Sequence, residues 1–304
     1  MSTTCFAFGE IVWDLLPSGK HAGGAPFNVA VHVAQIGGSS ALLSCVGRDE
    51  LGDEILAVAR RRSVNVDFVA RARSGLPTGT VSVRIDAHGH ASYAVAQPVA
   101  WDEIEVSPAA LEPVRQAGAL VYGSLAARSP CNLLQLERLL QVKGPLKFFD
   151  VNLRPPFSDA AQVMELARRA DVVKLNDSEA AQLAAYLRTG AAAQESLRDQ
   201  EAVACACETL AEATNVTRIC VTRGDKGAAF WDSGKLTTTP ALQVEVKDTV
   251  GAGDAFMAGL VVGLTNGTET RKVLQDAARL GAFVASQRGA TPLLPAELRA
   301  RFGR

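Results

Sequence analysis

The chain has 304 residues, of which 31 are Lys or Arg and 32 are Asp or Glu, so its net charge is −1. This balance argues against a dedicated nucleic-acid-binding protein, which usually carries an excess of basic residues. Hydrophobic residues make up 48% of the chain and charged residues 21%, as in proteins that fold around a buried core rather than remaining disordered.

No segment has the features of a membrane anchor or an export signal. The longest apolar stretch, Ala255–Leu264, has ten residues, whereas a membrane-spanning helix needs roughly 20. The N-terminus does not combine a basic region with an apolar one, as a secretory signal does. The six cysteines are not spaced like a zinc site, and a chain of this kind has little need of disulfides. We therefore expect a cytoplasmic protein without membrane or nucleic-acid partners.

Strand-like and helix-like segments alternate along most of the chain. The apolar runs of strand length are Thr4–Phe8, Ala41–Val46, Ala119–Tyr122, Leu146–Val151, Val172–Leu175 and Ile219–Thr222. The segments with helical spacing between them are Asn28–Ile36, Asp53–Arg62, Leu133–Gln141, Ala160–Ala170, Ser178–Leu187 and Ala202–Ala213. Continuous rather than alternating apolar runs indicate strands covered on both faces, as in a mostly parallel sheet. The pattern predicts an α/β sandwich.

One region interrupts this alternation. In Thr80–Ile85 apolar and polar residues alternate, and a turn at residues 86–90 leads into a second strand-like run, Ala91–Ala96. This pattern predicts a β-hairpin with one face toward solvent. Ile11–Leu16 is a further candidate strand. A small antiparallel sheet attached to the α/β core would act as a lid or as a dimer surface.

The segment from Asp248 to Phe256 carries the strongest chemical signal. It reads DTVGAGDAF, with a strand-like Val244–Val246 before it and a helix-like run after it. Two glycines at a helix start let backbone N–H groups converge on an anion, and the helix dipole adds positive charge. Asp254 then has two interpretations, a general base for a hydroxyl or a plain helix N-cap. Neither the Rossmann fingerprint nor the Walker A loop fits the spacing.

Two glycine-bounded turns near the N-terminus complete the set of motifs. GGAPFNVA at residues 23–30 allows close backbone approach, and Asn28 offers a donor and an acceptor from a first helical turn. GRDELG at residues 47–52 leads into a further helix. Each turn alone is a weak signal, and each is also consistent with an ordinary helix cap.

In combination, these motifs resemble the ribokinase-like (PfkB-type) carbohydrate kinases over nearly the whole chain. DTVGAGD at 248–254 matches the C-terminal signature of that family without a gap, and the two N-terminal turns resemble its N-terminal signature. The blocks DVNLR at 150–154, KLNDSE at 174–179 and TRGDKG at 222–227 are also similar and follow in the expected order.

The resemblance implies a three-layer α/β/α sandwich with a mostly parallel central sheet. It implies one kinase domain over residues 1–304, with a small β-sheet lid built from about residues 11–20 and 78–100. The implied reaction is transfer of the γ-phosphoryl group of ATP to a sugar hydroxyl. Asp254 would be the base, and the backbone N–H groups of Gly251, Ala252 and Gly253 would form the anion hole.

Further roles follow from the same resemblance, position by position. Substrate contacts are implied for Asp14, Gly24, Asn28, Asp254 and Arg154. Nucleotide contacts are implied for Asn176, Thr222, Gly224, Gly227, Gly251 and Gly253. Mg²⁺, held through water, is implied at Asn176 and Glu179, and a monovalent cation such as K⁺ at Asp248, Val250 and Gly289. Helix capping remains an alternative for Asn176, and a structural ion pair for Arg154.

The choice of sugar depends on finer details. The segments GEIVWDLLP at 9–17, PTGTV at 77–81 and AWD at 100–102 look most like bacterial fructokinases, which implies D-fructose as substrate. The alternatives are 2-keto-3-deoxygluconate, whose carboxylate would favour an arginine such as Arg154, and then ribose or a nucleoside. A catalytically silent sugar-binding protein is the alternative from another class. A homodimer through the lid would cover its apolar face.

Overall fold

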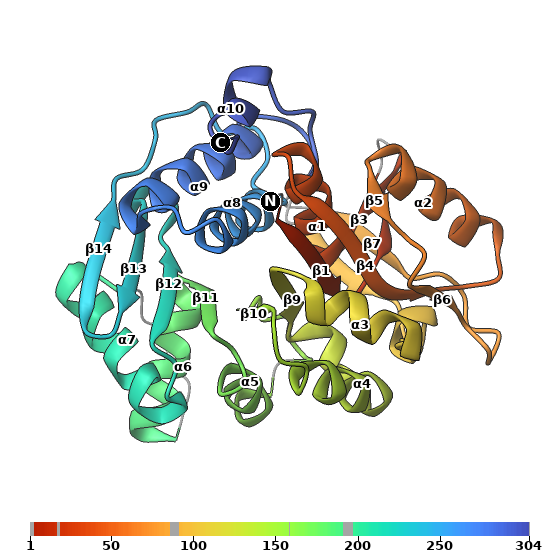
Figure 1. Ribbon diagram of the computed structural model, residues 1–304, viewed down its shortest axis with the longest axis horizontal. Coiled ribbons are helices and arrows are strands. Elements are labelled where there is room, and N and C mark those ends of the chain that lie inside the picture. The colour runs from red at the N-terminus through yellow and green to blue at the C-terminus, as the bar shows by residue number, and fades with distance from the viewer. Residues whose placement is uncertain (1–2, 17–18, 86–90, 158, 191–196, 304) are drawn as a thin grey trace.

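The structure is a computed structural model, and it describes all residues except 1–2, 17–18, 86–90, 158, 191–196 and 304. A large, mostly parallel sheet runs through its centre (Figure 1). Its strands, in spatial order, are β14 (Lys235–Thr239), β13 (Ala228–Asp232), β12 (Arg218–Thr222), β11 (Val172–Asn176), β10 (Leu146–Asp150), β9 (Ala119–Gly123), β1 (Thr4–Phe8), β4 (Ser39–Val46) and β5 (Val64–Asn65), with β6 (Val69–Arg71) also paired to β4.

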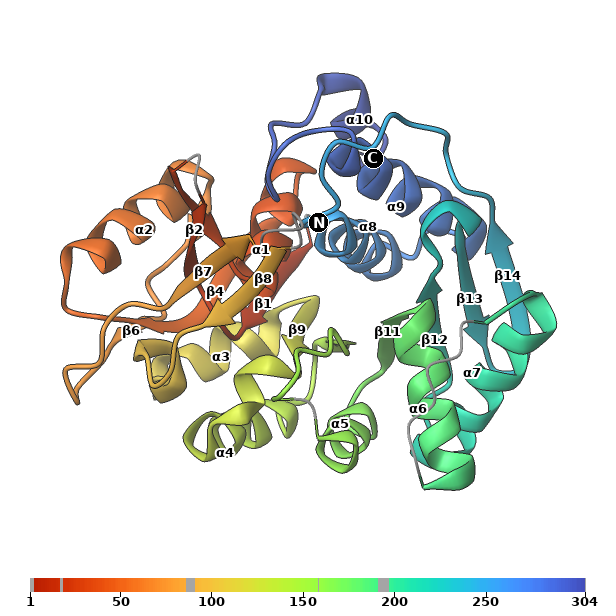
Figure 2. The same ribbon diagram turned by 180° about the vertical axis from the view of Figure 1, so that it is seen from behind.

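Helices cover both faces of this sheet, as Figures 1 and 2 show from opposite sides. One face is covered by α1 (Ala25–Gln35), α2 (Glu50–Arg61), α8 (Ala252–Thr265), α9 (Thr270–Ala285) and α10 (Ala296–Ala300). The other face is covered by α3 (Pro108–Gln116), α4 (Pro130–Leu140), α5 (Ala160–Ala167), α6 (Asp177–Thr189) and α7 (Gln200–Thr214). Short 3₁₀ turns lie at Ala100–Glu103, Leu125–Arg128 and Gly224–Lys226.

The apolar runs explain why the sheet is covered on both sides. Successive side chains of a strand point to opposite faces, and in β10 both Phe148 and Phe149 are fully buried. Phe148 belongs to the core under α1 and α8, and Phe149 to the core under α3–α7. The prediction of a three-layer α/β sandwich with a mostly parallel sheet is confirmed.

A second, smaller sheet lies beside the N-terminal half of the large one (Figure 2). Its strands, in order, are β3 (Gly19–Gly23), β2 (Val12–Leu16), β7 (Thr80–Ile85) and β8 (Ala91–Val95). The strands expected from the sequence are present, but the sheet is not wholly antiparallel, because β2 and β7 pair in parallel. The turn expected at 86–90 lies outside the described residues. The Trp13 indole packs inward and donates a hydrogen bond to the Leu51 carbonyl at 2.9 Å, which ties this sheet to α2.

Some elements differ from what the sequence patterns indicate. β3 has little strand propensity but pairs antiparallel with β2, so tertiary pairing outweighs propensity there. The β13–β14 hairpin was not predicted, although Ser233-Gly234 between the two strands is a turn signal. The strand expected at Val244–Val246 is absent from these described residues, and Val246 is 60% exposed. This segment runs irregularly from β14 toward α8.

Two sequence expectations concern the whole chain. Within the described residues, no helix is both long and apolar enough to cross a membrane. All six cysteines carry free thiols in the structure, and Cys5, Cys45, Cys207 and Cys220 are buried. These four behave as small apolar residues, which agrees with the expectation that the chain uses no disulfides.

Candidate active site

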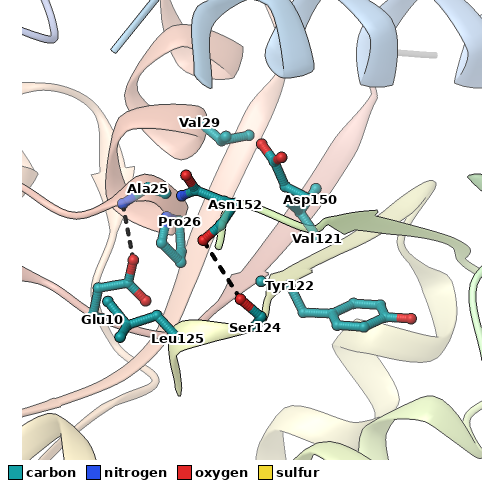
Figure 3. Close-up of a pocket in the computed structure, with 11 residues that line it drawn as sticks. Glu10, Ala25, Pro26, Val29, Val121, Tyr122, Ser124, Leu125, Asp150 and Asn152 are labelled. Atoms are coloured by element: carbon teal, nitrogen blue, oxygen red, sulfur yellow. Dashed lines mark hydrogen bonds between the residues drawn. The ribbon is translucent and has the colours of Figure 1, made fainter. Parts of the chain in front are cut away.

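The order of the strands determines where a site can form. The chain runs from β1 to β4 on one side, and β9 later pairs with β1 on the other side. At such a switch point the loops leave the carboxyl ends of neighbouring strands in opposite directions and open a crevice. A pocket lies there, and Figure 3 shows it. Its lining residues are Glu10, Ala25, Pro26, Val29, Val121, Tyr122, Gly123, Ser124, Leu125, Asp150 and Asn152.

Asp254 lies in the first turn of α8, and its carboxylate interacts electrostatically with Glu10 and Asp150, two residues that line this pocket. Its Oδ2 accepts a hydrogen bond of 2.8 Å from Nδ2 of Asn28, which lies in the first turn of α1. The N-cap of α8 is Gly251, so the carboxylate does not cap its helix. Desolvation, followed by the negative charge of Asp150, raises the pKa of Asp254 to about 6. Of the two interpretations of Asp254, the N-cap does not fit this geometry.

Gly251 and the residues after it form the start of α8. Gly251 has φ +78°, and a Cβ there would lie 2.5 Å from the Ala290 carbonyl oxygen. The N–H groups of a first helical turn lack intrahelical acceptors and point along the dipole. The Ala252 N–H makes a long hydrogen bond of 3.3 Å to the Thr249 carbonyl. The backbone at Gly253, the second residue of the helix, is exposed, so an anion can approach this turn.

The expected sugar contacts converge from the small sheet and from α1. Asp14 on β2 lies opposite His21 on β3, and its Oδ2 occupies the space that a Cβ on Gly23 would need. Burial raises the pKa of Asp14 to about 6, while the charge of His21 opposes that shift. Gly24 is the N-cap of α1 with φ +106°, and a Cβ there would lie 2.5 Å from the Glu10 carbonyl oxygen.

The three positions expected to hold a monovalent cation lie together. Both oxygens of the Asp248 carboxylate accept backbone hydrogen bonds of 3.0 Å, one from the Val250 N–H and one from the Gly289 N–H. The side chain of Asp248 therefore ties the loop before α8 to the loop after α9. The carbonyl groups of this junction remain the groups that would coordinate a cation.

Asn176 and Glu179 form a capping box at the start of α6. The Asn176 side chain accepts from the Glu179 N–H at 2.9 Å, and Glu179 Oε2 accepts from the Asn176 N–H at 2.8 Å. Glu179 Oε1 accepts from the Leu153 N–H at 2.8 Å. Helix capping, the alternative considered for Asn176, is thus present in the structure. The Asn176 oxygen also accepts from the Ser178 hydroxyl at 2.9 Å, so both of its lone pairs are used. Each Glu179 oxygen keeps one lone pair, through which a water bound to Mg²⁺ would be held.

The expected nucleotide contacts lie at the far end of the same sheet edge. Thr222 ends β12, and its hydroxyl donates a hydrogen bond of 3.3 Å to the Leu175 carbonyl. Gly224 begins the 3₁₀ turn that follows, and Gly227 ends it with its N–H bonded to the Gly224 carbonyl at 3.1 Å. β12 pairs with β11, and Thr222 lies opposite Asn176 in this pairing. The expected nucleotide contacts therefore begin beside Asn176.

Three buried charged residues were missed in the sequence. Glu10 lines the pocket and accepts from the Ala25 N–H at 3.1 Å (Figure 3), and burial raises its pKa to about 7. Asp150 and Lys174 form an ion pair with side chains that are each 6% exposed. In the sequence, each of these charged residues lies inside or just after an apolar strand run. Charged side chains are rarely buried without a partner, so this pattern indicates a paired or functional group.

Arg154 lies near this cluster without being part of the buried core. It is exposed, and Nη1 donates a hydrogen bond of 3.1 Å to the Leu153 carbonyl. Its charge lowers the pKa values of both Glu10 and Asp254. Arg154 therefore supplies positive potential close to Glu10 and Asp254.

The structure places an open helix start beside a partly buried carboxylate on an α/β sandwich, an arrangement that suits an enzyme acting on an anionic substrate. Residues 17–297 match the family described as pfkB family carbohydrate kinase, and the chain belongs to that family. The predicted resemblance and the prediction of a carbohydrate kinase are confirmed.

Individual relatives agree with this family. The chain is 30% identical over 319 residues to fructokinase-2 of Zea mays, covering 95% of this chain and 90% of the relative. A fructokinase of Vibrio cholerae O395, solved with fructose, ADP and calcium bound, is 27% identical with a TM-score of 0.78, covering 99% of both chains. The 2-dehydro-3-deoxygluconokinase of Thermotoga maritima has a TM-score of 0.83 at 21% identity over 98% of both chains and shares the fold.

Proposed function

We propose that this protein is an ATP-dependent fructokinase that converts D-fructose to fructose 6-phosphate. The observation that carries the proposal is the hydrogen bond between Asn28 and Asp254. It joins a helix start expected to bind the sugar to the helix start expected to bind the transferred phosphate. The fructokinase names of the relatives support the choice of sugar.

In the proposed reaction, the Asp254 carboxylate accepts the proton of the sugar hydroxyl. The hydroxyl oxygen forms a bond to the γ-phosphorus of ATP, the bond from that phosphorus to the bridging oxygen breaks, and ADP leaves. The N–H groups at Gly251, Ala252 and Gly253 stabilise the charge on the equatorial oxygens as it develops. Asn28 holds the base in place and contacts the sugar together with Asp14 and Gly24.

The ions have proposed places around this centre. Mg²⁺ would be held through water near Asn176 and Glu179 and would neutralise charge on the phosphates. A monovalent cation such as K⁺ would lie at the junction of Asp248, Val250 and Gly289 and fix the loop before the anion hole. The nucleotide would extend toward Thr222, Gly224 and Gly227.

The remaining expectations concern the assembly of the protein. We propose that residues 1–304 act as one catalytic domain whose small sheet closes over the sugar as a lid. We also propose that the protein forms a homodimer through this lid sheet. Its proposed location is the cytoplasm. Arg154 is the residue by which a keto-acid sugar would be recognised if fructose is not the substrate.

A substrate panel tests the choice of sugar. We expect a coupled ADP-release assay with Mg-ATP and K⁺ to show selective turnover of fructose over 2-keto-3-deoxygluconate, ribose, glucose and adenosine. Specificity of this kind depends on a few buried polar contacts, and a missing hydroxyl partner changes it strongly. Turnover of the keto-acid sugar alone would replace fructose by that substrate. Tight sugar binding without turnover of any member would favour the silent binding protein.

The pH profile tests the base. Because the pKa of Asp254 is raised to about 6, the carboxylate is ionised above that pH and becomes protonated below it. We expect kcat for fructose to fall as the pH drops through about 6. Asp14→Asn serves as the comparison, because Asp14 is an expected sugar contact whose pKa is also raised to about 6. An acid limb that disappears in this variant would assign the limb to Asp14 instead.

A further inference from the structure

A buried lysine lies directly behind the anion-binding turn and has no role in the mechanism above. Lys174 is on β11, and its Nζ lies 2.9 Å from both Oδ1 and Oδ2 of Asp150 at the end of β10. The same Nζ lies 3.6 Å from the position that a Cβ on Gly253 would occupy. The ammonium group is therefore the positive charge packed against the first turn of α8.

The charges around Lys174 are mostly negative. Its ammonium interacts with the carboxylates of Asp150, Glu179 and Asp254. The arriving ATP would add several more negative charges to this end of the sheet. Backbone dipoles at the start of α8 provide only partial positive charge, so a full charge at a fixed position makes a separate contribution.

Stability alone gives little reason for this arrangement. Burying two ions costs several kcal/mol of desolvation for each, and replacing a buried pair with apolar residues is often neutral or stabilising. The Lys174–Asp150 pair nevertheless lies at the carboxyl edge of the sheet, with Asp150 in the lining of the pocket (Figure 3). The closeness of the Lys174 ammonium to Gly253 and Asp254 suggests that the buried pair is kept for its charge at the site.

We propose that Lys174 is an electrostatic positioning residue, held by Asp150 behind Gly253. Its ammonium stabilises the ionised form of Asp254 and the negative charge that gathers on the phosphoryl group during transfer. Lys174 acts through the first turn of α8 and does not touch the sugar. This inference rests on the proposed kinase reaction and assigns a further residue to it.

The groups that face Asp254 predict how its titration responds. Asp150 on β10 raises the pKa of Asp254, whereas Lys174 on β11 and Arg154 after β10 lower it, and the hydrogen bond from Asn28 on α1 lowers it as well. Glu10, after β1, also interacts with Asp254. Removing the charge of Lys174 therefore raises the pKa of Asp254 and moves the acid limb of the kcat profile to higher pH.

The test compares wild type, Lys174→Met and the double variant Asp150→Asn/Lys174→Met. Removing an anion-hole donor costs 10²–10³ in kcat, and a cation one layer behind it should cost less, about tenfold. We expect Lys174→Met to show this loss with little change in the KM for fructose, and its acid limb to lie at higher pH. In the double variant, which removes both buried ions together, the limb returns to the wild-type position or below, while kcat stays low.

Two results would overturn the proposal. If the acid limb of Lys174→Met stays at the wild-type pH, Lys174 does not act on Asp254. If the double variant recovers the wild-type kcat, Lys174 serves only to neutralise Asp150. Thermal unfolding shows whether Lys174→Met folds. If it does not, the kcat of the double variant still decides whether Lys174 serves only to neutralise Asp150.

A measurement without turnover separates this inference from the proposed reaction. Titration of the Asp254 carboxyl carbon by ¹³C NMR, in wild type and in each variant without substrate, reports its pKa directly. Wild type that is inactive on every sugar would contradict the proposed function alone. An Asp254 pKa that is equal in wild type and Lys174→Met would contradict the role of Lys174 alone.

Discussion

Replacing Asp254 with Asn should lower kcat for fructose by about 10²–10⁴-fold and leave the Kd values for sugar and ATP nearly unchanged. Asparagine has the same shape, and its carbonyl oxygen can still accept the hydrogen bond that Asn28 donates at 2.8 Å. The substitution therefore removes the proton acceptor and keeps the local structure. Steady-state kinetics measure the fall in kcat, and calorimetric titration measures the Kd values for sugar and ATP.

A matched control separates the loss of a base from a general effect of the substitution. Asp199 is the N-cap of α7, where its side chain accepts from the Ala202 N–H at 2.8 Å. Asparagine is an equally good N-cap, so Asp199→Asn should retain full turnover. If Asp254→Asn also turned over fructose at nearly the wild-type rate, Asp254 would not be the base.

Replacing Gly251 with Ala should damage the anion hole. A Cβ at this position would lie 2.5 Å from the Ala290 carbonyl oxygen and 2.6 Å from its Cα, and the backbone has φ +78°. Ala290 cannot easily retreat, because the buried His32 imidazole holds its carbonyl with a hydrogen bond of 2.9 Å. The start of α8 must shift instead, and loss of one aligned donor typically costs about 10²–10³ in kcat.

Gly267→Ala is the matched control for this prediction. Gly267 follows α8 with φ +68°, and nothing lies within 4 Å of the position that a Cβ would take. It therefore shares the backbone penalty of about 1 kcal/mol without the collision. We expect both variants to unfold at lower temperature and only Gly251→Ala to lose kcat. Equal kcat values in the two variants would show that the start of α8 tolerates displacement.

The sequence alone determined the fold class and the family, and it indicated the segment that we propose carries the chemistry. All three depend on local patterns. Continuous apolar runs such as the one around Phe148 indicate strands covered on both faces, and the glycines beside Asp254 indicate a helix start open to an anion. The family resemblance rested on the same short motifs, and it is confirmed.

The tertiary structure decided which distant residues meet. Asn28 and Asp254 are 226 positions apart, and Lys174 and Asp150 are 24 apart. Nothing in the spacing of these residues predicts either contact. β3 forms a strand despite its composition because β2 offers it an edge. The pKa values of Glu10 and Asp254 likewise depend on burial and on charges from other strands. Local patterns encode how each segment folds, whereas long-range packing sets the electrostatics of the site.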